Sequence, residues 1–319
     1  MTPRFTIVGI GEALLDVYDD KMVLAGAPLN VAVHAHQLAQ PRGGRGVVVS
    51  RVGQDDLGQR VADELAQRGM CTDYLQTDPD RDTGRAYVSL DEHGQPTFQI
   101  VQGAAWDVLQ FDPDDEDLAR RCDAVCFGTL AQRDGQSRNS IYRFLNATTR
   151  RAVRLFDANL RQDYYNQQII RRSCELATAV KLNEHELSIV CDLLGLSEPS
   201  RAAPGQPPNS PDTLVHALLK KFDLNLVVLT RGSKGTVLFT PTGKHEAEPV
   251  SYPPAAAGAA DPVGAGDACA AGLLVGLVLR LPLDRTLQLA NHAGAFVASQ
   301  GGATPTLPNA ILKMVKTSA

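Results

Sequence analysis

Asp261-Pro-Val-Gly264-Ala265-Gly266-Asp267 leads directly into Ala-Cys-Ala-Ala-Gly-Leu-Leu-Val-Gly-Leu-Val-Leu, which ends at position 279. The second part is apolar on almost every side, which predicts a helix buried in a protein core. Glycines in the first turn of this helix would leave backbone N–H groups and the positive end of the helix dipole aimed at one place. The stretch therefore predicts an anion site that a phosphate can approach closely.

Asp267 is unexpected in an anion site, because its carboxylate would repel a phosphate held beside it. The carboxylate is explained if it faces the other reactant, a hydroxyl that must lose its proton as it attacks. The alternative is an aspartate that only caps a helix after a glycine turn. This stretch alone leaves both interpretations open.

Composition limits the class of protein. The chain has 319 residues, 44% of them hydrophobic, which suits one large α/β domain or two modest ones. A net charge of −5, with both signs spread along the chain, argues against nucleic acid as the main partner. The longest apolar run, at 268–279, is too short to span a membrane, and no secretory signal is found. The six cysteines lack metal-ligand spacing, so we expect reduced thiols in a soluble, cytoplasmic protein.

Strands and helices alternate along most of the chain. Buried strands are expected at residues 5–10, 46–51, 124–127, 153–157, 179–182 and 226–230, separated by helical segments. Such alternation predicts a parallel sheet with helices on both faces and ligands at the carboxyl ends of its strands.

Two segments depart from this alternation. Residues 83–91 and 96–102 have the alternating pattern of a β-hairpin, which we expect to form a lid over the site. Residues 195–211 are rich in Pro and Ser and predict a mobile surface loop, because the strand–helix pattern resumes after them.

Asp16 and Asn30 are candidates for binding a polyol. A carboxylate can accept from two hydroxyls, and an amide both donates and accepts. Asn30 follows Gly26 and Pro28, and proline suits the first turn of a helix. A turn aspartate and a solvent-facing asparagine are the alternative. The nearby Gly9-Ile-Gly11 has Leu14 where a dinucleotide-binding motif would have its third glycine, which disfavours a dehydrogenase.

A set of short motifs resembles the ribokinase-like, or PfkB, carbohydrate kinases over nearly the whole chain. In order, the motifs are Gly11-Glu12 with Asp16, Gly26-Ala-Pro-x-Asn30-Val-Ala, Val52-Gly-x-Asp55-x-x-Gly58, the Thr83-Gly hairpin, Asp157-x-Asn159-x-Arg161, Asn183-x-x-Glu186, Thr230-x-Gly232-x-x-Gly235 and Gly264-Ala-Gly-Asp267. The first, second and fifth most resemble the fructokinase branch.

The resemblance implies a three-layer α/β/α sandwich with a mainly parallel central sheet. It implies one catalytic domain over residues 1–319, with a small β-sheet lid built from insertions at about 12–25 and 83–103. Lid hairpins in this family often pair across a dimer, so the resemblance also implies a homodimer formed through the lid.

The resemblance also assigns roles to residues. Asp267 would be the base, Gly264, Ala265 and Gly266 the anion hole, and Arg161 a cation that neutralises phosphate charge. The implied sugar-binding residues are Asp16, Gly26, Asn30 and Asn159. The implied nucleotide-binding residues are Asn183, Glu186, Thr230, Gly232, Gly235 and Asn291, with Glu186 reaching Mg²⁺ through water. A loop for a monovalent cation such as K⁺ would include Asp261, Val263 and Gly302.

The activity that follows is ATP-dependent phosphorylation of a primary hydroxyl on a small sugar, with fructose the leading substrate. Kinases of 2-keto-3-deoxygluconate, ribose or a nucleoside are alternatives, and a non-catalytic sugar-binding relative is a third. Pro262 stands where the family usually has Thr. Because proline lacks an N–H, this departure affects the prediction of the cation loop more than the assignment of Asp267 as the base. No Walker A sequence occurs, which excludes a P-loop kinase.

Overall fold

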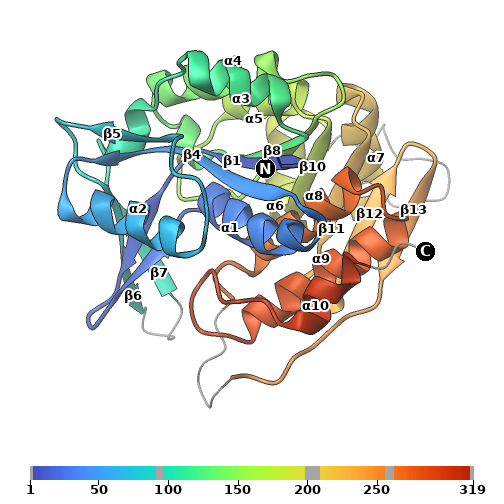
Figure 1. Ribbon diagram of the computed structural model, residues 1–319. Helices are drawn as coiled ribbons and strands as arrows, with labels where there is room; N and C mark the ends of the chain where they lie inside the picture. The colour runs from blue at the N-terminus through green and yellow to red at the C-terminus, as the bar shows by residue number, and fades with distance from the viewer. Residues whose placement is uncertain (1–2, 91–95, 198–208, 256–261, 317–319) are drawn as a thin grey trace.

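The computed structural model describes residues 3–90, 96–197, 209–255 and 262–316 (Figure 1). In this part of the chain the central sheet has nine strands. Their order is β13 (Gly243–Ala247), β12 (Thr236–Thr240), β11 (Leu226–Thr230), β10 (Ala179–Asn183), β9 (Val153–Asp157), β8 (Ala124–Phe127), β1 (Thr6–Ile10), β4 (Arg45–Gly53) and β5 (Leu75–Asp78). Neighbours from β5 to β11 pair in parallel, and β12 and β13 add an antiparallel edge.

Helices cover both faces of this sheet. One face carries α3 (Pro113–Arg121), α4 (Gly135–Ala147), α5 (Gln167–Leu176), α6 (Glu184–Leu193) and α7 (Pro211–Phe222). The other carries α1 (Ala27–Ala39), α8 (Ala265–Val278), α9 (Leu283–Ala298) and α10 (Asn309–Met314). Figure 1 shows α3 and α4 above the sheet and α1, α9 and α10 below it. Side chains on β1 alternate between the two layers, since Val8 joins the first core and Ile7 the second. The expected three-layer fold is confirmed.

A second, four-stranded sheet lies beside this core. Its order is β3 (Met22–Ala25), β2 (Leu14–Val17), β6 (Gly84–Leu90) and β7 (Pro96–Ile100). β2 pairs with β3 antiparallel and with β6 in parallel, and β6 pairs with β7 antiparallel. These strands come from the two segments expected to build the lid. Parts of the expected hairpin turn and of the 195–211 loop lie outside the described residues.

Several helices begin where a strand of the central sheet or lid ends. α1 follows β3 with Gly26 as its N-cap and Pro28 in its first turn. α2 (Asp56–Gln67) follows β4, and its cap Asp55 accepts from the Gly58 N–H at 2.7 Å. α6 follows β10 with Asn183 as its cap. Capped helix starts therefore gather at the carboxyl edge of the sheet, where ligands bind in such folds.

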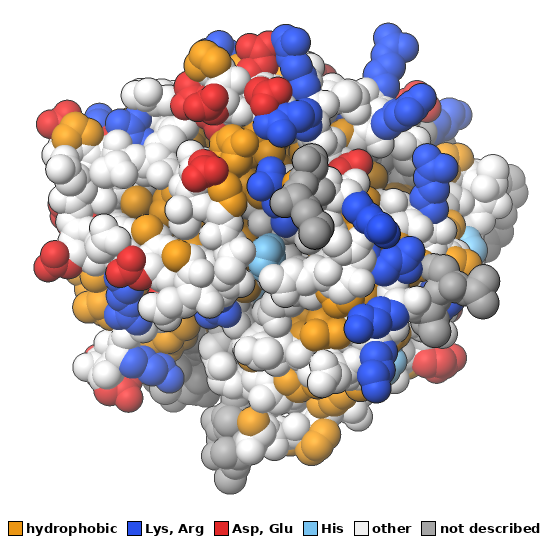
Figure 2. All heavy atoms as spheres, viewed as in Figure 1, with side chains coloured by type: hydrophobic (Ala, Val, Ile, Leu, Met, Phe, Trp, Pro, Cys, Tyr) orange, Lys and Arg blue, Asp and Glu red, His pale blue; other side chains and the backbone are white. Residues whose placement is uncertain are grey.

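The distribution of surface charge and the state of the cysteines are those expected from the composition. Both signs of charge are spread over the face shown in Figure 2. All six cysteines are free, and only Cys71 is not buried. Among the described helices, none combines the length and apolarity needed to cross a membrane.

Gly9 offers a test of how closely α1 packs on β1. A Cβ at this position would lie 1.9 Å from the Pro28 carbonyl oxygen and 3.2 Å from the Ala32 Cβ. Because such a contact forces the helix away from the sheet, we expect Gly9→Ala to lower the free energy of unfolding by about 1–3 kcal/mol in urea titrations. Gly243→Ala is the control, since nothing lies within 4 Å of its Cβ position. Equal stability of the two variants would contradict this packing.

Candidate active site

The first turn of α8 is shaped by Gly264. Its φ is 80°, and a Cβ there would lie 2.3 Å from the Ala303 carbonyl oxygen, so only glycine fits. The Ala265 N–H donates back to the Pro262 carbonyl at 3.2 Å. Gly266 and Asp267 follow in the first helical turn, where N–H groups have no acceptor within the helix. The expected helix start with glycine at its N-cap is present, and anion binding there stays a prediction.

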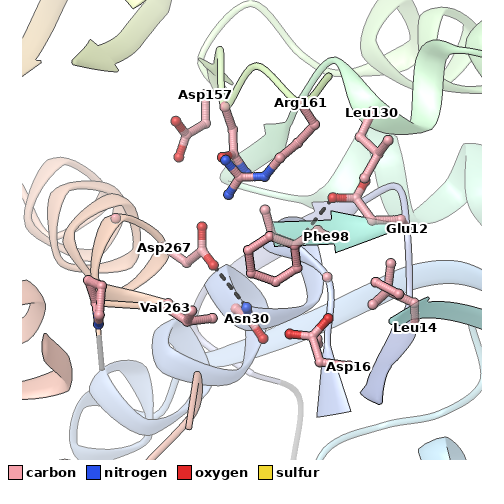
Figure 3. Close-up of a pocket in the computed structure, with 18 of the residues that line it drawn as sticks. Glu12, Leu14, Asp16, Asn30, Phe98, Leu130, Asp157, Arg161, Val263 and Asp267 are labelled. Atoms are coloured by element: carbon pink, nitrogen blue, oxygen red, sulfur yellow. Dashed lines mark hydrogen bonds between the residues drawn. The ribbon is translucent and has the colours of Figure 1, made fainter. Parts of the chain in front are cut away.

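Asp267 is buried and faces the start of α1. The Asn30 side-chain N–H donates to Asp267 Oδ2 at 2.8 Å (Figure 3). Burial and, after it, the negative charge of Asp157 raise the pKa of Asp267 to about 6, against the effect of the Asn30 hydrogen bond. Such a carboxylate is mostly ionised at neutral pH and is a stronger base than an exposed aspartate.

A cavity of about 360 Å³ opens beside Asp267. The lid provides an apolar wall of Leu14, Ala86, Phe98 and Ile100 together with the carboxylate of Asp16. The predicted residues that line this cavity are Asp16, Gly26, Asn30, Asn159, Arg161, Asn183, Glu186, Thr230, Val263, Gly264, Gly266 and Asp267. Figure 3 shows Asp16, Asn30 and Asp267 directed towards the same space below Phe98. Polar groups that converge on an apolar wall suit a small polyhydroxylated ligand.

A second cavity of about 470 Å³ adjoins the first and shares Thr230, Pro262 and Gly266 with it. Of the predicted nucleotide-binding residues, it is lined by Thr230, Gly232, Gly235 and Asn291. Its other walls are mainly apolar and include Val250, Tyr252, Pro254, Ala290 and Ala298. The Asn291 amide donates to the Glu248 carbonyl at 3.2 Å and so holds the segment after β13. A flat apolar group and a phosphate chain would fit such a cavity, because it ends at the first turn of α8.

Asn183 and Glu186 form a capping box at the start of α6. Asn183 accepts from the Glu186 N–H at 2.9 Å, and Glu186 Oε2 accepts from the Asn183 N–H at 2.9 Å. The other oxygen, Oε1, accepts from the Leu160 N–H at 3.0 Å. In the described part of the chain no three His, Cys, Asp or Glu residues gather as a metal site. This donor set fits a magnesium ion that keeps its waters and is held mainly by phosphates.

The segment after β9 carries the two remaining predicted residues. Asn159 has a positive φ of 38°, and Arg161 is exposed at the rim of the first cavity. Figure 3 shows the Arg161 guanidinium pointing towards Asp267. An always-charged group at this rim can approach a phosphate without first leaving a buried partner.

The predicted cation loop is placed only in part. Val263 lines the first cavity, whereas Gly302, with φ of 83°, is not among the residues that line either cavity. Asp261 lies outside the described residues. The cation site stays a prediction.

Sequence reasoning gave no role to a buried ion pair in the first cavity. Lys181 Nζ lies 2.9 Å from both carboxylate oxygens of Asp157. Burial lowers the pKa of Lys181, but the groups around it, Asp157 first and then Cys269 and Glu186, together outweigh burial and the pKa is raised overall. A Cβ at Gly266 would lie 3.5 Å from Lys181 Nζ, so the ammonium lies close to the first turn of α8. The signal in the sequence was a lysine inside an otherwise apolar strand.

Comparison with known proteins agrees with this geometry. Residues 10–310 match the model of the pfkB family of carbohydrate kinases. A fructokinase from Klebsiella pneumoniae is 29% identical and covers 94% of this chain and 95% of its own length. A fructokinase from Escherichia coli is 27% identical with the same coverage.

Solved structures show the same fold. A fructokinase from Vibrio cholerae, bound to fructose, ADP and a calcium ion, has a TM-score of 0.76 and 26% identity, and covers 98% of this chain and 99% of its own. A ribokinase-like protein from E. coli has a TM-score of 0.79 at 20% identity, with 99% of both chains covered, which shows the fold alone. The fold and site thus define a ribokinase-like sugar kinase. The chain belongs to the pfkB family of carbohydrate kinases, phosphotransferases that act on a sugar hydroxyl.

The raised pKa of Asp267 has a consequence for stability. Because the folded-state pKa lies near 6 against an ordinary 3.8, the carboxylate costs folding free energy above pH 6, and this cost disappears as pH falls towards 4. We expect Asp267→Asn to raise the free energy of unfolding by roughly 2–3 kcal/mol at pH 8 and by little at pH 4, in urea titrations at both values. A variant less stable than wild type at pH 8 would contradict the burial of a costly charge.

Proposed function

We propose that this protein is an ATP-dependent kinase that phosphorylates a primary hydroxyl of fructose or of a closely similar sugar. The observation that carries the proposal is the place of Asp267, which lines the first cavity in the first turn of α8, directly after Gly266, which lines both cavities. The fructokinase names of the curated relatives and the fructose in the Vibrio cholerae structure support the choice of sugar.

In this proposal the first cavity holds the sugar. Asp16 and Asn30 bind its hydroxyls, together with Gly26 and Asn159, and the apolar wall of the lid excludes water. Asn30 also donates the 2.8 Å hydrogen bond to Asp267, so the same side chain positions both the base and the bound sugar. The arrangement places a reacting hydroxyl beside the carboxylate before any chemistry begins.

The transfer follows from these positions. The Asp267 carboxylate takes the proton as the sugar oxygen bonds to the γ-phosphorus of ATP, and the bond from that phosphorus to the bridging oxygen breaks to release ADP. The backbone around Gly264, Ala265 and Gly266 stabilises charge on the phosphoryl oxygens, and Arg161 approaches from the rim. Thr230, Gly232, Gly235 and Asn291 shape the nucleotide cavity.

Mg²⁺ would be held near Asn183 and Glu186 through water, and when bound it offsets charge on the phosphates. Glu186 can serve in this way because its backbone contacts fix the direction of the carboxylate. A K⁺ requirement is part of the proposal through Val263, Gly302 and Asp261. We place the reaction in the cytoplasm.

The substrate is tested by ATP consumption on a panel of fructose, ribose, glucose, 2-keto-3-deoxygluconate and adenosine, with and without K⁺. We expect selective turnover of fructose. If another compound of the panel is preferred, the mechanism stays as proposed and that compound replaces fructose as the substrate. No turnover, together with no thermal shift on adding any sugar, would contradict the proposal.

The base is tested by Asp267→Asn. We expect kcat to fall by at least a hundredfold while the sugar and ATP dissociation constants change little, since the amide keeps the shape but accepts no proton. Stopped assays give kcat, and calorimetry gives both binding constants. A variant with near-wild-type kcat would disprove the assignment.

A homodimer through the lid is also part of the proposal. Val17 on β2 pairs with Met22 on β3 and Tyr87 on β6, so the three side chains form one row. Met22 is 39% exposed and Tyr87 45%, the two most exposed large apolar side chains described. We expect Tyr87→Asp to shift the mass measured by light scattering from dimer to monomer. A wild type that is already monomeric would contradict this interface.

A further inference from the structure

Glu12 lies where the chain enters the lid. It follows Gly11, whose φ of 148° turns the chain out of β1, and precedes β2 by one residue. Its backbone carbonyl packs against Gly26, where the chain returns from the lid into α1, since a Cβ at Gly26 would lie 2.4 Å from that oxygen. The two connections of the β2–β3 hairpin to the main body therefore touch at Glu12.

The side chain of Glu12 joins these two connections. Its Oε1 accepts from the Ala27 N–H, the first of α1, at 3.2 Å. The side chain also lines the first cavity, and Figure 3 shows its carboxylate near Leu130 on the side of the cavity opposite Asp267. Glu12 thus connects the base of the lid, the start of α1 and the cavity.

The second oxygen of Glu12 is not satisfied by the part of the protein that the structure describes. Glu12 is 3% exposed, and its Oε2 has no hydrogen-bond partner within the described residues. A buried polar atom without a partner is costly, and such atoms call for an explanation. The charged groups that affect Glu12 are Asp267 on α8 and Arg161 after β9, and Asp16 on β2 lines the same cavity.

A hydroxyl matches this oxygen better than a cation would. Burial raises the pKa of Glu12 to about 7, so near neutral pH the side chain is divided between carboxylate and acid. A hydroxyl can donate to the carboxylate and accept from the acid, so it can bond both forms. The apolar neighbour Leu130 offers no competing partner.

We propose that Glu12 Oε2 binds one hydroxyl of the sugar and that this contact holds the hinge of the lid in its sugar-bound position. The inference rests on the proposed function and adds a specificity-determining residue to it. The sugar supplies the missing partner of a buried oxygen, and the other oxygen keeps hold of α1. Binding of the correct hydroxyl and the position of the lid are thereby coupled.

The test combines substitutions with a series of monodeoxy analogues of the preferred sugar. Glu12→Met keeps the volume of the side chain and removes both hydrogen bonds. We expect it to weaken binding of the full sugar at least tenfold by calorimetry, with ATP affinity changed less than twofold. For the one analogue that lacks the bound hydroxyl, we expect the penalty to shrink below threefold. Glu12→Gln, which can still accept from Ala27 and meet a hydroxyl, should restore most of the affinity.

Asp55→Ala is the matched control. Asp55 accepts from the Thr83 N–H at 2.8 Å and so holds the other entry to the lid, yet neither residue lines the cavity. A hinge effect alone should weaken all analogues by the same factor. If Glu12→Met does so too, the contact with the sugar is disproved. Should Glu12→Met fail to fold, Glu12→Ala takes its place in the same series.

Calorimetry without nucleotide measures sugar binding even in a chain that transfers no phosphoryl group. An inactive wild type whose sugar binding depends on Glu12 would overturn the kinase proposal and support this one. If the wild type is active but Glu12→Met weakens binding of every analogue by the same factor, the kinase proposal is supported and the Glu12 contact is disproved.

Discussion

One hydrogen bond joins the two helix starts on which the site depends. Asn30 and Asp267 lie 237 positions apart in the sequence and 2.8 Å apart at the start of α1 and α8. α1 begins where the chain leaves the four-stranded sheet, and the first turn of α8 lies between the two cavities. The bond therefore fixes the wall of the first cavity at α1 relative to the first turn of α8. α1 and α8 pack against each other below the sheet, which keeps this distance from changing.

The electrostatics of the site follow from burying several charges together. Asp157 and Lys181 neutralise each other at 2.9 Å beside the first turn of α8. In the described part of the chain Asp267 and Glu12 form no ion pair, and burial raises the pKa of both against the effect of Arg161. Two buried carboxylates with raised pKa values cost stability, and the large apolar core offsets that cost.

The sequence predicted the features that depend on local physics. Buried strands were recognisable as apolar runs. The glycines at the start of α8 were singled out for the approach of a phosphate, whereas the positive φ of Gly264 and its contact with Ala303 became visible only in the structure. β13 was missed because its sequence, Gly-Lys-His-Glu-Ala, is polar and it pairs with β12 alone. The pair of Asp157 and Lys181 was missed because its partners sit on different strands, which no local pattern links. Both features depend on contacts between separate strands, and the residue types in one segment do not reveal such contacts.

The lid is not an independent flap. On β2, Leu14 and Asp16 face the cavity, and Leu15 between them is fully buried in a core shared with Leu24, Val61 and α1. Because alternate residues of one strand serve the site and the core, the hairpin cannot open widely without exposing Leu15. Movement of the β2–β3 hairpin is therefore confined to its two short connections, at Gly11 and Gly26. In the proposal for Glu12, a ligand that contacts those connections acts on the position of the hairpin through very few contacts.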